Sequence, residues 1–113
     1  MTLKRMVLEI GMGNDLHGGD YTKAAIRAVQ DAVHHSSLTM VRSLGIDRNT
    51  VRVDVTIGVQ QPDRVDREAV KRTLPMGQVS VNVVKGGLDV PDEEVKDLAV
   101  IATAAVVVRV DLP

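Results

Sequence analysis

The last strand-like segment of the chain is apolar on both faces that a β-strand would present. Between Leu98 and Val108 the sequence reads LAVIATAAVVV, and Thr103 is the only residue there with a hydrogen-bonding side chain. A half-buried strand alternates apolar and polar residues, whereas a strand buried on both faces is apolar throughout. The segment therefore predicts a strand that needs a covering layer on each side.

The rest of the chain predicts too few helices to supply both layers. Strands are predicted at 6–10, 50–60, 78–87 and 98–112, a long helix at 21–44, and a short helix from Asp66. Two helices can cover one face of such a mixed four-stranded sheet, so another copy of the chain is the economical cover for the other. We therefore expect a single α+β domain over residues 1–113 that assembles as a closed homo-oligomer, with a trimer favoured over a dimer or a monomer.

The long helix has a small-residue stripe and a predicted start and end. Ala25, Val29 and Ala32 recur at three- and four-residue spacing, which indicates one buried face. Their small size predicts a close approach of the helix to the sheet. Asp20 is the expected N-cap, and Gly45 is the expected left-handed stop.

Composition excludes several classes of function. The 113 residues carry a net charge of −1, Tyr21 is the only aromatic residue, and there is no cysteine. A nucleic-acid surface needs basic patches or aromatic platforms, and disulfides or thiolate sites need cysteine. No apolar run is long enough to span a bilayer. We expect a cytoplasmic protein that binds neither nucleic acid nor membrane.

The candidate site is the segment GMGNDLHGGDY at residues 11–21, between the first strand and the long helix. Glycines let a ligand approach the main chain, and a helix N-terminus favours an anion. A dinucleotide-binding motif does not fit, because its third glycine would fall on Leu16. A Walker loop does not fit either, because no Gly-Lys-Ser/Thr follows. Three interpretations of Asp15 and His17 stay open. The two residues form an acid–base pair, or they are metal ligands, or Asp15 caps a turn while His17 is a surface or interface residue.

Two resemblances add to this interpretation. GMGNDLHG resembles the G-x-G-x-D-x-H-G signature of a small bacterial family of conserved hypothetical proteins, the Lin-type family, which makes Asp15 and His17 the best candidates for function. The segment order resembles the trimeric chorismate mutase fold and the repeats of ring-opening hydrolases of cyanuric acid or barbiturate. That resemblance implies active sites in clefts between subunits. Met12 stands near the expected position of the hydrolases' lysine, and Thr56 and Gly58 replace their Ser-Gly-Gly.

Two further segments complete the predicted site. Lys85 precedes two glycines and either binds an anionic or carbonyl oxygen, or is a solvated lysine before a turn. His34 and His35 point in different directions on a helix, so we interpret them as a surface patch. The predicted catalytic residues are Asp15, His17 and Lys85, and the predicted ligand-binding residues are Gly11, Gly13, Gly18, Gln60 and Gly86.

The predicted function is that of a small enzyme whose polar small-molecule site lies at a subunit interface. The expected reaction is hydrolysis or isomerisation of a small cyclic amide or carboxylate, without a cofactor or a metal. The alternative is a non-catalytic ligand-binding or structural oligomer, in which the glycine-rich segment only packs the assembly.

Overall fold

The computed structural model describes residues 2–35, 45–74 and 77–112. Its elements are β1 (Thr2–Asp15), α1 (Tyr21–His35), η1 (Arg48–Thr50), β2 (Arg52–Val59), η2 (Pro62–Arg64), α3 (Arg67–Lys71), β3 (Gln78–Lys85), β4 (Leu88–Asp92) and β5 (Asp97–Leu112). The fold is α+β, as predicted, and in the described residues one long and one short α-helix lie beside a mixed sheet.

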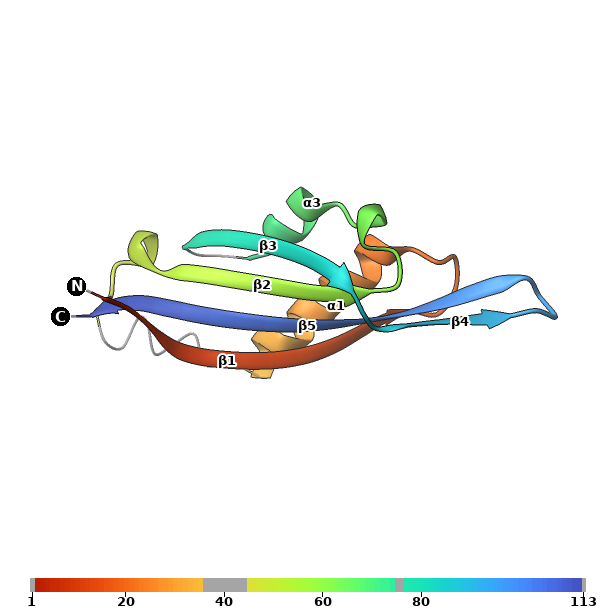
Figure 1. Ribbon diagram of the computed structural model, residues 1–113, viewed down its shortest axis with the longest axis horizontal. Coiled ribbons are helices and arrows are strands. Elements are labelled where there is room, and N and C mark those ends of the chain that lie inside the picture. Colours follow the sequence, from red (N-terminus) through yellow and green to blue (C-terminus); the bar gives the residue numbers. More distant parts are fainter. Residues whose placement is uncertain (1, 36–44, 75–76, 113) are drawn as a thin grey trace.

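The sheet has five strands in the order β1-β5-β2-β3, and β4 also pairs with β5. β2 and β3 are parallel, whereas β5 is antiparallel to β1, β2 and β4. β5 is therefore the central strand, flanked along its length by β1 on one side and by β2 and then β4 on the other. The two ends of the chain lie together at one end of the sheet (Figure 1).

β4 is a fifth strand that the sequence pattern did not predict. It has five residues, LDVPD, which lack regular alternation and include Pro91, a residue that cannot donate to a ladder. The predicted third strand was too long, because β3 ends at Lys85 and Gly86–Gly87 carry the chain across the end of β2 into β4. Residues 93–96 form the turn from β4 to β5.

The first strand is much longer than the predicted segment 6–10, and this boundary was wrong. β1 continues through Gly11 and Gly13 to Asp15. A Cβ atom on Gly13 would lie 2.2 Å from the backbone nitrogen of Ala28, and one on Gly11 would lie 2.4 Å from that of Ala32. These two glycines therefore let α1 pack directly on the strand, which confirms the predicted close approach.

The predicted N-cap of the long helix is confirmed, and Asp66 caps the short helix. The backbone N–H of Lys23 donates to Asp20 Oδ1 at 3.0 Å, and that of Ala69 donates to Asp66 Oδ1 at 3.1 Å. Gly45 has the expected positive φ of 66°. The predicted helix segment 36–44 lies outside the described residues.

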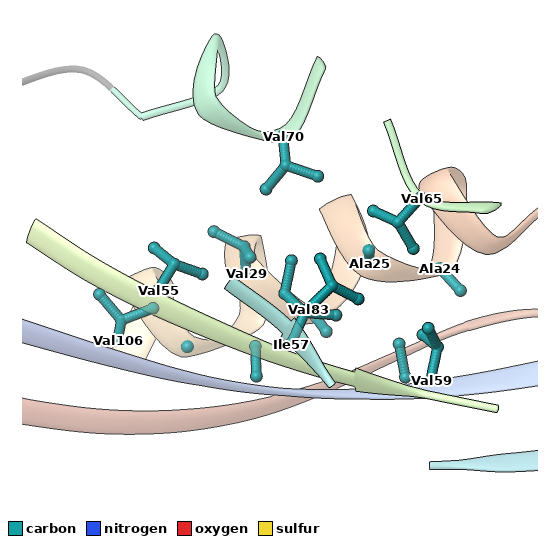
Figure 2. Close-up of a cluster of buried hydrophobic side chains, with 14 of the residues drawn as sticks. Ala24, Ala25, Val29, Val55, Ile57, Val59, Val65, Val70, Val83 and Val106 are labelled. Atoms are coloured by element: carbon teal, nitrogen blue, oxygen red, sulfur yellow. The ribbon is translucent and has the colours of Figure 1, made fainter. Parts of the chain in front are cut away.

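The core lies between the helices and one face of the sheet. Figure 2 shows side chains of α1, α3, β2 and β5 gathered there, with Ile57 near the centre. On β5 the even-numbered residues from Val100 to Val110 are buried against this core. The odd-numbered residues from Ile101 to Arg109 face away from the helices and are partly or fully exposed. One apolar face of β5 is thus uncovered in the single chain.

Candidate functional site

The side chain of Asp15 fixes the turn between β1 and α1. Asp15, only 5% exposed, lies on the helix side of the sheet, and its Oδ2 accepts from the backbone N–H of Asp20 at 2.9 Å. Arg27 Nη1 lies 3.8 Å from the other oxygen of Asp15. Gly18 has a φ of 94°, which suits glycine because it lacks a Cβ atom. Asp15 therefore positions the turn that presents His17.

His17 pairs with a residue from the other end of the chain. Its Nδ1 lies 2.9 Å from Asp97 Oδ2, and its side chain is 87% exposed. The expected Asp15–His17 pair does not form, because Asp15 is the last residue of β1 and faces α1. His17 lies beyond the end of that strand, where the turn carries it to the first residue of β5.

Asp97 is held in its charged form by its surroundings. The backbone N–H of Gly18, the His17 ring and the backbone N–H of Leu98 all hydrogen-bond to it and lower its pKa to about 2. An ionised carboxylate only accepts hydrogen bonds, so Nδ1 of His17 must be the donor. In the neutral ring, Nε2 then carries the lone pair and is free to accept a proton.

The depressed pKa of Asp97 predicts a pH-dependent contribution to stability. In the unfolded chain this group titrates near 3.8, so its contribution is present above that pH and is lost as the pH falls through about 2. Denaturant unfolding at a series of pH values should show parent and Asp97→Asn curves that converge over this window. Curves that stay parallel from pH 4 to pH 2 would contradict the assigned contacts.

A hollow of about 540 Å³ lies beside this pair. We call it the arm hollow, after the two-stranded arm that β4 forms with the start of β5. Leu16, His17, Asp97 and Ala99 line it, together with residues 90–95 of β4 and the following turn. The imidazole of His17 and the carboxylate of Asp97 thus both border this hollow.

Lys85 lies at a different hollow, on the open face of the sheet. Its volume is about 690 Å³, and we call it the face hollow. Its lining includes Ile10, Gly11, Met12, Thr56, Lys85, Gly86 and Thr103. The structure thus does not bring Lys85 into the arm hollow with His17. The catalytic role of Lys85 and the ligand contacts of Gly11, Gly13 and Gly18 stay predictions.

Gln60 and Gly86 meet at the crossing from β3 to β4. Gln60 Nε2 donates to the carbonyl oxygens of Gly86 and Gly87, both at 3.1 Å. This amide therefore holds the crossing in place. The predicted ligand-binding role of Gln60 stays a prediction, and the structure adds a structural role.

A polar cluster at the start of α1 was not predictable from the sequence pattern. Tyr21, 2% exposed, donates from its hydroxyl to Asp89 Oδ2 at 2.5 Å, and Gln61 Nε2 donates to the same hydroxyl at 3.1 Å. The Arg64 guanidinium lies 5.2 Å from the centre of the ring. Asp89 belongs to the strand that the pattern did not reveal, so no local signal linked it to Tyr21.

The pKa of Tyr21 is raised above 10.0 by burial, by the hydrogen bond to Asp89 and by that residue's charge. Stability from this group is present below pH 10 and is lost as the pH rises through the folded-state pKa. Tyr21 is the only tyrosine, so tyrosinate absorbance reports it alone. We expect a titration midpoint above 10 that falls in Asp89→Asn but not in the control Asp92→Asn. A parent midpoint at 10 in the folded protein would contradict this environment.

Within residues 2–35, 45–74 and 77–112, no group of three or more histidine or acidic side chains could hold a metal ion. Over the same ranges, none of the helices has the length and hydropathy required to cross a membrane.

Comparison with known proteins relates the chain to others of the same fold. It is similar to an FtsZ-like protein of unknown function from Nostoc punctiforme, whose crystal structure superimposes with a TM-score of 0.85 at 35% sequence identity over 99% of each chain. No curated protein matches the chain. The sequence model of the conserved hypothetical proteins Lin0512_fam matches residues 5–108. The chain therefore belongs to the conserved hypothetical protein family Lin0512_fam, which confirms the predicted family.

Proposed function

We propose that the protein binds a small polar molecule in the arm hollow and that His17 acts there as an acid–base group. The observation that carries this proposal is the 2.9 Å contact between His17 Nδ1 and Asp97 Oδ2. Asp97 fixes the tautomer and orientation of the ring, and the opposite nitrogen stays accessible. Asp97 replaces Asp15 as the residue that orients His17.

The proposed reaction is hydrolysis or isomerisation of a small cyclic amide or carboxylate. In hydrolysis, Nε2 of His17 accepts a proton from the attacking water and returns it to the leaving nitrogen. Asp97 stays anionic throughout and stabilises the charged imidazolium.

The proposal places this site at the interface of a cytoplasmic homotrimer. The support is that the odd-numbered residues of β5 are only partly buried in the single chain, and that Ile10 and Met12 beside them are exposed. Exposed apolar patches of this kind mark interaction sites. The topological likeness to trimeric chorismate mutases is part of the same proposal.

Ring opening of barbituric acid and of cyanuric acid by the full chain tests the reaction. We expect His17→Gln to lower turnover by about a hundredfold or more, because a positioned acid–base group contributes about that much. Asp97→Asn should also lower turnover and alter its pH profile. His34→Gln, a histidine on α1, is the matched control and should retain activity.

Melting temperatures of the same variants separate chemistry from structure. A His17→Gln protein that melts like the parent but has lost turnover supports the proposal. A parent that opens neither ring, or a His17→Gln protein with full turnover, contradicts it. A parent without turnover, whose His17→Ala variant melts at a lower temperature or loses the oligomer without any effect on ligand binding, would favour the non-catalytic alternative.

A further inference from the structure

Three arginines lie in one row across the open face of the sheet, near the chain termini. Arg5 of β1 is in register with Arg109 of β5, and Arg109 is in register with Arg52 of β2. Residues directly opposite each other on neighbouring strands have Cβ atoms about 4.5–5.5 Å apart, and like charges there destabilise the pairing. This row, which we call the arginine row, therefore favours an anionic partner.

The carboxylates of the chain only partly neutralise the arginine row. Arg109 donates to Asp54, and Arg52 Nε lies 3.6 Å from the same carboxylate. Asp111, two residues after Arg109 on β5, lies opposite Leu3 of β1. Within the described ranges, the side chain of Arg5 has no hydrogen-bond or ion-pair partner.

The opposite end of the molecule is acidic. β4 and the start of β5 form a two-stranded arm that projects beyond the helices (Figure 1). The tip of this arm carries Asp92, Glu93 and Glu94, with Lys96 as its only cation. Glu94 donates its backbone N–H to Asp92, and all three acidic residues are exposed.

The arm is not a compact part of the fold. The radius of gyration is 15.4 Å, whereas a compact domain of this length has about 13 Å. Leu88 and Val90 are 59% and 47% exposed on the arm. A two-stranded hairpin is marginally stable by itself in water, so these side chains favour a covering surface.

The open face is large and apolar enough to provide that surface. Between the arginine row and the arm it exposes Leu8, Ile10, Met12 and Val84 around the face hollow. The longest axis of the molecule, 57 Å, runs from the chain termini to the arm.

We propose that the acidic arm tip of one copy docks on the arginine row of a second copy, with the apolar part of the arm lying along the open face. The inference rests on the oligomer of the proposed function and names its contact. Tip and row are unlike patches on the same chain, so each copy donates one arm and accepts another. A head-to-tail contact of this kind generates a closed ring when its rotation permits.

Docking of the arm also completes the candidate site. Val90, residues 92–95 and Asp97 line the arm hollow, so a neighbour that covers the arm also covers His17. In the single chain the His17 side chain is 87% exposed. A covered imidazole would work in a site from which bulk water is excluded, where charge interactions are stronger.

Sedimentation of full-length charge-reversal variants tests the contact. Glu93→Lys with Glu94→Lys, and separately Arg5→Glu with Arg52→Glu, should each raise the dissociation constant of the oligomer about tenfold or more. One chain that carries all four changes should assemble nearly as well as the parent, because the opposite charges are restored. Arg67→Glu with Lys71→Glu on α3 is the control, with the same change in charge away from the open face, and should assemble like the parent.

Salt provides a second measurement on the same proteins. The parent oligomer should weaken between low and high ionic strength, because exposed charge pairs are screened. A monomeric parent, reversal variants that assemble like the parent, or a fourfold variant no better than either half would overturn the contact. If the fourfold variant assembles again but His17→Gln leaves turnover unchanged, only the proposed reaction is refuted.

Discussion

Replacement of Gly13 by alanine is expected to lower the free energy of unfolding by about 3 kcal/mol or more. A Cβ atom at this position would lie 2.2 Å from Ala28 N and 2.5 Å from Ala24 O. Both are backbone atoms inside α1, so a rotamer change cannot relieve the overlap. The helix must move away from β1, and the contacts of the buried alanines with the sheet are lost along with it.

Denaturant unfolding followed by circular dichroism measures this effect, and Tyr21 fluorescence reports the start of α1. Asn14→Ala is the matched control, because Asn14 is the next residue of β1 and lies exposed on the opposite face. That control should stay within about 0.5 kcal/mol of the parent. A Gly13→Ala protein as stable as the control would refute the close packing of α1 on β1.

The contact between α1 and β1 shows how far local pattern could predict this fold. The alanine stripe correctly indicated that α1 approaches the sheet closely. The two glycines that accept it were instead assigned to a ligand-binding loop, because glycine after a short apolar run is typical of a turn. The two halves of the contact are more than ten residues apart, and the sequence of each half alone does not identify its partner.

The alternation of apolar and polar residues predicted β2, and the continuous apolar run predicted β5, since each strand has a face buried in a regular layer. It could not predict β4, whose five residues pair with β5 through the backbone and whose side chains are mostly exposed. The edge of the sheet is set by tertiary pairing, and local preference is weak there.

In the candidate site, too, the residue types could be predicted from the sequence, whereas their contacts could not. The turn residues Asp15, His17 and Gly18 were singled out from their composition, but the contact of His17 with Asp97 could not be predicted. Asp97 lies 80 residues away in the chain and reaches His17 only because β5 starts beside the end of β1. Tyr21 and Asp89 are likewise joined by tertiary structure alone. Residue types are thus visible in the sequence, whereas their pairing depends on strand register.

The other large effect is expected at Gly87, where alanine should lower the free energy of unfolding by about 4 kcal/mol. Gly87 has a φ of 61°, and a Cβ atom there would lie 2.1 Å from Ile101 O and 2.9 Å from Gly58 O. The chain crosses here from β3 to β4 over the end of β2. Displacing this crossing would break the pairing of β4 with β5 and release the arm.

Gly45→Ala isolates the part of this effect that comes from crowding. Gly45 has a φ of 66°, nearly the same as that of Gly87, but a Cβ atom there meets no atom of the described residues within 4 Å. Its substitution should cost only the left-handed backbone term, about 1 kcal/mol. Unfolding of both variants under identical conditions should therefore differ by about 3 kcal/mol. Equal losses would mean that backbone conformation alone requires glycine at position 87 and that the crossing is not tightly packed.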